Sequence, residues 1–256
     1  MAIPVRRRWI FWLLLWGMVE CSLAFGETVN APIQRISSFG SLDEVDAWMK
    51  HYYLHPEPEK VPLAIEFLAK GGILDDFTVH PLFIAFFGEI FRHNEKRLPS
   101  WMKRLDSLRE SHKKLLWSAL WFSYTKKGKE LLQGVDLKAH PASKELIDTL
   151  LRQSPPDVLT IPVDSTAVVD SLWGAFQATG NEDCVLRVIE VLPWVNEKSD
   201  PKKLLVGGVA KWSLTSNAVQ HERVLKICKI QVDKQPQEVQ SVLKEVIHQA
   251  EEGLRK

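Results

Sequence analysis

The stretch VVDSLWGAFQATGNEDCVLRVIEVLP, residues 168–193, decides the fold class of this 256-residue chain. Its first half carries apolar residues at helical spacing, with two adjacent small residues between Leu172 and Phe176. Gly180 and Asn181 then give a turn signal, because both residue types tolerate the backbone conformations that turns require. A second segment of helical periodicity follows and ends at a proline. The stretch therefore predicts two helices joined by a tight turn.

The same local pattern occurs at three other places. Each copy has a Leu, a bulky apolar residue, two positions that are mostly small, and another apolar residue. The four copies are Leu82–Phe86, Leu116–Leu120, Leu172–Phe176 and Leu205–Val209, so their starting points lie 34, 56 and 33 residues apart. Spacings near 34 are typical of two-helix repeats, in which small residues let neighbouring helices approach.

On these residues the segment 168–193 resembles a degenerate tetratricopeptide repeat. It departs from that family at Val185, where a small residue is expected, and it lacks the aromatic residue of the second helix. The resemblance extends loosely over residues 80–216. It implies an all-α fold of stacked antiparallel helix hairpins, a tetratricopeptide- or HEAT-like superhelix. The alternative is an irregular helical bundle in which the four motifs coincide by chance.

Helical patterns fill most of the remaining chain. Ser41 and Glu44 have the spacing of a capping box at the start of the first helix. The proline-rich residues 153–163 indicate an irregular segment or an internal break. Helices are expected over 41–52, 60–70, 81–93, 101–108, 113–124, 126–132, 143–152, 164–178, 182–191, 202–212, 217–232 and 238–254.

The N-terminus has the three parts of a secretory signal. Arg6, Arg7 and Arg8 precede an uncharged apolar run from Trp9 to Val19, and small residues allow cleavage after Ala24 or Gly26. The run is short for a membrane span, which needs about 20 residues. We expect a signal peptide at 1–26, a flexible linker at 27–40 and a helical domain at 41–256. An uncleaved N-terminal membrane anchor and a lipid anchor on Cys21 are the alternatives.

Removal of the signal changes the composition. The whole chain has 33 basic and 32 acidic residues, and losing three Arg and one Glu leaves 30 against 31, a net charge of −1. This balance argues against nucleic acid as a partner. Cys184 and Cys228 are the cysteines that remain. In an oxidising compartment they could form a disulfide, and otherwise they are two buried thiols.

The sequence contains no recognisable catalytic, cofactor or metal-binding motif. His51 and His55 are four residues apart, but Pro56 places His55 at a helix end, so no metal site is predicted. Glu89 and His93 have the same spacing on an apolar helix and are the best candidates for a ligand-binding or acid–base pair. The alternative hypothesis, an enzyme with an unrecognised helical active site, rests on these two residues.

Tryptophan side chains are the other candidates for a binding surface. Trp117 and Trp121 lie four residues apart on one expected helix face, and Trp173 lies in the deciding hairpin. Such residues are favoured anchors at interfaces, although aromatics at helical spacing are more often core. The sequence favours an exported helical-repeat protein, periplasmic or secreted, that binds a protein or peptide without catalysis, cofactor or membrane span. A structural envelope component or a secreted effector is a further alternative.

Overall fold

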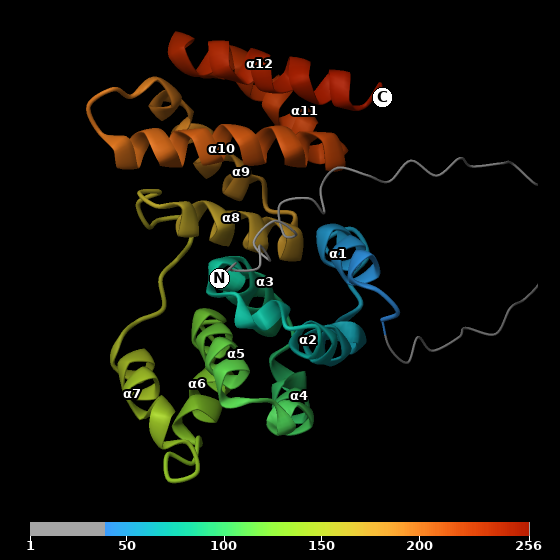
Figure 1. Ribbon diagram of the computed structural model, residues 1–256, viewed down its shortest axis with the longest axis vertical. Helices are drawn as coiled ribbons and strands as arrows, with labels where there is room; N and C mark the ends of the chain where they lie inside the picture. Colours follow the sequence, from blue (N-terminus) through green and yellow to red (C-terminus); the bar gives the residue numbers. More distant parts are fainter. Residues whose placement is uncertain (1–38, 256) are drawn as a thin grey trace, which may run out of the picture.

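The computed structural model describes residues 39–255, and that part of the chain contains helices and no strand, which confirms the predicted all-α class (Figure 1). The predicted signal at 1–26 and the linker up to residue 38 lie outside the described residues. The α-helices are α1 (Leu42–His51), α2 (Val61–Lys70), α3 (His80–His93), α4 (Leu98–Arg104), α5 (Glu110–Phe122), α6 (Lys126–Gln133), α7 (Lys144–Arg152), α8 (Thr166–Thr179), α9 (Glu182–Glu190), α10 (Pro201–Gln220), α11 (Glu222–Gln231) and α12 (Gln237–Gly253).

The first helix begins as its sequence predicts. The Ser41 hydroxyl accepts a hydrogen bond from the Glu44 backbone N–H at 3.2 Å. The Glu44 carboxylate accepts a hydrogen bond from the N–H of Gly40 at 2.7 Å, one residue before the expected donor.

Phe39 is buried and packs edge-on against Trp48, with ring centroids 5.6 Å apart. Phe39, which falls within the linker predicted for 27–40, therefore belongs to the core.

The helices form a stack in which α3 lies in the middle. From top to bottom of Figure 1 the order is α12, α10, α8, α3 and α5, and α3 packs extensively against both α8 and α5. The hairpin predicted at 168–193 is present as α8 and α9, joined at Gly180 with a left-handed φ of 68°. However, α8 packs against α3 and not against the preceding α7, because the connection 153–165 returns the chain to α3. Stacking in chain order, as in a tetratricopeptide superhelix, is not confirmed.

Two glycines allow helices to touch through their backbones. A Cβ on Gly174 of α8 would lie 2.2 Å from the carbonyl oxygen of Leu82 in α3. A Cβ on Gly207 of α10 would lie 2.5 Å from the backbone carbon of Trp194, in the 3₁₀ turn Leu192–Asn196. At Gly174 and Gly207 the small positions of the repeated motif thus mark close approaches, as their sequence pattern predicted, whereas a Cβ on the neighbouring Gly208 would meet no atom within 4 Å.

The buried apolar residues fall into two clusters. One is formed mainly by residues 39–151, and the other mainly by residues 158–250. The division falls close to the predicted break at 153–163. Helix α3 belongs to both clusters, since Phe86 lies in the first and Ala85 in the second. The two clusters are therefore joined by a shared helix.

The predicted helix boundaries differ most from the structure at one pair of helices. Residues 202–212 and 217–232 were expected to be separate helices, but α10 continues to Gln220 and the break falls at His221. The polar residues between them satisfy their side chains within the helix: Thr215 donates to the Lys211 carbonyl at 2.9 Å and Asn217 to the Ser213 carbonyl at 2.9 Å. Such local bonds make a Ser/Thr/Asn-rich stretch compatible with a helix interior.

Within residues 39–255, no helix combines the length and the apolarity that crossing a bilayer demands.

Candidate functional site

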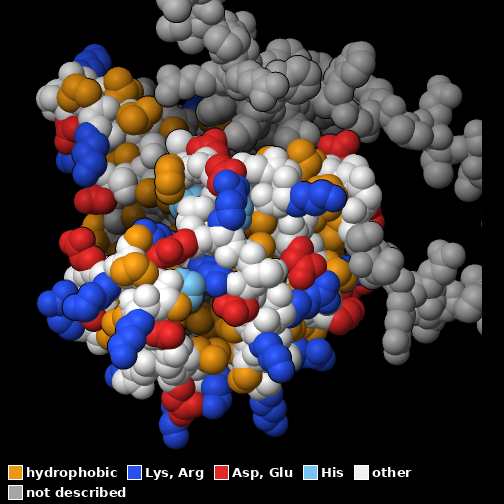
Figure 2. All heavy atoms as spheres, turned by 60° about the horizontal axis from the view of Figure 1, so that its bottom comes forward, with side chains coloured by type: hydrophobic (Ala, Val, Ile, Leu, Met, Phe, Trp, Pro, Cys, Tyr) orange, Lys and Arg blue, Asp and Glu red, His pale blue; other side chains and the backbone are white. Residues whose placement is uncertain are grey.

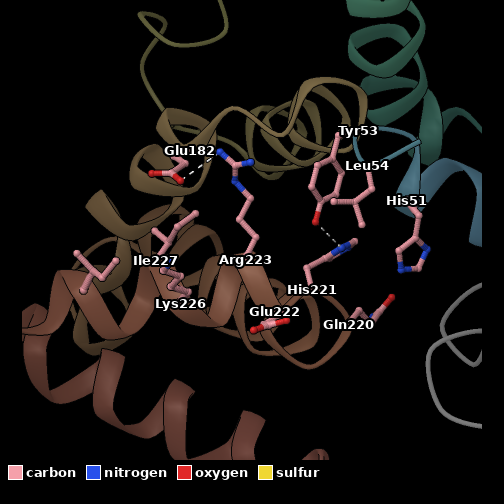
Figure 3. A pocket seen from close by; sticks show the side chains of 11 residues that line it. His51, Tyr53, Leu54, Glu182, Gln220, His221, Glu222, Arg223, Lys226 and Ile227 are labelled. Carbon is pink, nitrogen blue, oxygen red and sulfur yellow. Dashed lines mark hydrogen bonds and ion pairs between the residues drawn. The ribbon is translucent and has the colours of Figure 1, made fainter. Parts of the chain in front are cut away.

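A hollow of about 500 Å³ lies where three distant parts of the chain meet (Figure 3). It is bounded by the end of α1, the start of α9 and the corner between α10 and α11. Its lining residues are His51, Tyr53, Leu54, Glu182, Gln220, His221, Glu222, Arg223, Lys226, Ile227 and Ile230. The α1 segment lies more than a hundred residues before the other two, which are 38 positions apart from Glu182 to Gln220, so only the fold brings the three together.

Tyr53 fixes the segment after α1 against the α8–α9 turn. Its backbone N–H donates to the Gln177 carbonyl at 3.1 Å, and its ring lies 5.1 Å from that of Phe176. A Cβ at Gly180 would lie 2.6 Å from the Tyr53 ring, so a glycine is needed there for space as well as for its positive φ. This wall of the hollow is thereby held against the α8–α9 turn.

His221 forms the floor at the α10–α11 corner. It is 2 % exposed, and its Nδ1 lies 3.5 Å from the Tyr53 hydroxyl. Its Nε2 is buried and has no hydrogen-bond partner. Burial, followed by the neighbouring positive groups His51 and Lys50, lowers the pKa of His221 to about 4, so the imidazole is neutral at physiological pH. A buried polar atom without a partner costs free energy that a ligand could recover.

The other end of the hollow combines an ion pair with apolar side chains. Arg223 Nη2 lies 3.2 Å from Glu182 Oε1, and both residues are exposed. Leu54 and Ile230 are 51 % and 47 % exposed, although they are large and apolar. Figure 3 shows Tyr53, Leu54 and His51 entering from one side and the residues of α11 from the other. The site thus offers apolar contact at its rims and polar groups of both signs.

A second hollow of about 320 Å³ lies beside the N-terminal half of α5. Phe77, which is strongly exposed, and the apolar Ile84 and Leu115 line it together with Lys114. Its three segments, residues 77–84, 110–118 and 142, lie closer together in the sequence than those of the first hollow. On the face that Figure 2 shows, Lys and Arg side chains lie among Asp and Glu side chains, in keeping with the balanced charge of the sequence.

The predicted tryptophans lie outside both hollows. Trp117 is buried in the first cluster beside the His140 ring, and Trp173 is buried in the second cluster with its indole nitrogen unpaired. Trp121 is half-buried, and its indole N–H donates to the Gln153 carbonyl at 3.1 Å. The structure does not bring the three side chains together, and at Trp117 and Trp173 their role is packing.

Glu89 and His93 engage different partners. The buried Glu89 carboxylate lies 3.1 Å from Arg92, whose guanidinium also donates to the Ser123 carbonyl at the end of α5. Burial raises the pKa of Glu89, and the Arg92 charge opposes that shift. The exposed His93 ring donates to the Glu89 backbone carbonyl at 2.8 Å. The side chains therefore do not form the acid–base pair that their spacing suggested; Glu89 and Arg92 join α3 to α5.

Cys184 and Cys228, for which the sequence left a disulfide open, are two free, buried thiols in the structure. Burial raises the pKa of each thiol to about 12, which keeps both protonated and unreactive at neutral pH.

Sequence reasoning missed Tyr53, His221 and Arg223 as site residues. It did single out His51, but paired it with the exposed His55; the structure places the His51 ring beside that of His221 instead. His221 fell inside a helix expected at 217–232, where a lone histidine carries no signal.

Comparison with known proteins gives no match: no family model, no curated protein and no solved structure matches the chain. The proposed function therefore rests on the chain's own residues.

Proposed function

We propose that this protein is an exported helical scaffold that binds a segment of a partner protein in the hollow between α1, α9 and the α10–α11 corner. The observation that carries the proposal is the hollow itself, which three segments of the chain form around a buried, unpartnered His221 nitrogen. Its size lies within the range of about 300–1,000 Å³ that is typical of ligand sites.

The lining indicates the character of the bound segment. Leu54 and Ile230 expose apolar surface at the rim, and the buried Ile227 extends this surface inward. Exposed apolar side chains that cluster beside polar groups are typical of protein-binding sites. Arg223 and Glu182 offer one group of each charge. These features favour a segment with an apolar side chain flanked by polar or charged residues.

Selection of peptides from a displayed random library against the purified chain tests this function. We expect the selected peptides to bind Leu54→Asp at least about ten-fold more weakly than the original chain, because a carboxylate at the rim removes apolar contact. Leu205→Asp on α10 is the matched control, since Leu205 is 60 % exposed and does not line the hollow. Both affinities are measured by fluorescence anisotropy.

Both substituted leucines are exposed, so both variants should remain folded, and circular dichroism checks this. Peptides that bind Leu54→Asp as tightly as the original chain would place the binding surface elsewhere. A library that yields no peptide bound in this hollow would also contradict the proposal.

Export is the second part of the proposal, and the features of residues 1–26 support it. We expect a mature chain that begins at Phe25 or Glu27, after cleavage behind Ala24 or Gly26. Intact mass spectrometry of the protein from the envelope and medium fractions of its native cell measures this directly. An intact N-terminus on all of the protein would instead support the alternative of an anchored chain.

A further inference from the structure

Two histidines from opposite ends of the chain face one another at one end of the hollow. His51 is in the last turn of α1, and His221 is at the α10–α11 corner. Their ring centroids are 5.6 Å apart and their planes are tilted by 50° (Figure 3). Neither ring donates to or accepts from the other, so the pair needs a different explanation.

On each ring Nδ1 makes the hydrogen-bond contact, and Nε2 has no partner among residues 39–255. The Nδ1 of His51 donates to the Ala47 carbonyl at 2.9 Å, which leaves a lone pair on its Nε2. The Nδ1 of His221 lies 3.5 Å from the Tyr53 hydroxyl, while its Nε2 is buried without a partner. Histidines that bind metals usually hold one nitrogen in a bond to a carbonyl or another oxygen and use the other as ligand. Both rings have this arrangement.

The separation of the rings suits a shared metal ion. Zinc–nitrogen bonds are about 2.0–2.1 Å long and tetrahedral, so two imidazoles on one zinc ion have ring centroids roughly 5 Å apart. The observed 5.6 Å requires a shift of only some tenths of an ångström. His51 is exposed and can make this shift, whereas the buried His221 is fixed between Tyr53 and Phe176.

We propose that His51 and His221 bind a divalent transition-metal ion of the zinc class through their Nε2 atoms. Imidazole nitrogen is a preferred ligand for zinc, copper and nickel, and not for magnesium or calcium. No group of three or more His, Cys, Asp and Glu side chains with metal-binding geometry occurs in residues 39–255. The ion therefore keeps open positions toward the hollow for water or for a ligand atom of a bound molecule. The metal proposal does not rest on the proposed peptide binding, although both concern the same hollow.

Titration of the full chain with zinc, after removal of metal with a chelator, tests the proposal by isothermal calorimetry. We expect one ion per chain at this site, and an affinity at least about ten-fold lower in His51→Ala. His55→Ala is the matched control, because His55 is also exposed and lies four residues further along. His51 is exposed, so its removal leaves the fold intact. NMR signals of the two imidazoles should shift on addition of zinc, and those of His55 should not.

His221→Gln is a second variant that should lose the same binding, with circular dichroism to show that it folds. If it does not fold, His51→Ala decides the matter alone. Absence of saturable zinc binding to the folded chain would overturn the proposal. So would binding that His51→Ala leaves unchanged, or binding that His55→Ala weakens equally, since both would place the ion on other surface histidines.

Discussion

Replacing Gly174 with alanine is expected to destabilise the protein by about 3 kcal/mol, the upper end of the usual cost of overpacking a core. The added Cβ would lie 2.2 Å from the Leu82 carbonyl oxygen and 3.1 Å from the Phe86 backbone nitrogen. Both are main-chain atoms of α3, so no side-chain rotation can relieve the overlap. Either α8 must move away from α3 or the α3 backbone must distort, and each response opens the packing between the two clusters.

Gly208→Ala is the control for this substitution. Gly208 also lies inside a helix, α10, but a Cβ there meets no atom within 4 Å. Alanine should therefore stabilise the protein by about 0.5–1 kcal/mol through its better helix propensity. Urea unfolding followed by circular dichroism gives both free energies. Equal effects of the two substitutions would show that the close approach of α8 to α3 is not as described.

Replacing Asp170 with asparagine is expected to stabilise the protein by about 3 kcal/mol at pH 8, and this is the second large effect. Asp170 is half-buried on α8, and no residue in 39–255 forms an ion pair or hydrogen bond with its carboxylate. Burial raises its pKa from 3.8 to about 6. A carboxyl whose pKa is higher in the folded protein destabilises it when ionised, by about 1.4 kcal/mol for each unit of the shift.

The sign of this effect gives a pH signature. Above pH 6 the Asp170 carboxylate is ionised in both states, so the full cost applies and asparagine removes it. As the pH falls from 6 to 3.8 the folded protein takes up a proton before the unfolded chain does, and the advantage of asparagine disappears. Thermal unfolding of both proteins at pH 8, 6 and 4 measures the trend. A difference that does not change with pH would mean that the carboxylate is solvated.

The hairpin at 168–193 could be predicted because its determinants are local. Periodicity, the Gly180–Asn181 turn and the closing proline lie within 26 residues, and the structure has α8 and α9 there. The position of that hairpin in the stack could not be predicted. It depends on Gly174 meeting α3, and the partner residue Leu82 lies 92 positions earlier in the chain.

The candidate site could not be predicted from the sequence for a similar reason. Tyr53 and His221 are 168 residues apart, and neither stands in a recognisable motif. The tryptophans were misleading because periodicity shows which residues share a helix face but not what covers that face. Helix α8 lies between α3 and α10, so the face that carries Trp173 is closed by other helices. Sequence patterns located the apolar faces, and only the tertiary arrangement separates a core from a surface.

The place of α3 in both apolar clusters also bears on how the molecule unfolds. In a linear array of repeats each unit contacts only its neighbours, so the array can lose structure gradually from its ends. Here Phe86 and Ala85 of one helix serve different cores, and the connection at 153–165 returns the later half of the chain to that helix. If either cluster unfolds, α3 is lost and the other cluster loses the residues that this helix contributes to it. We therefore expect the two halves to unfold as a single cooperative unit, despite the break that their sequence suggests.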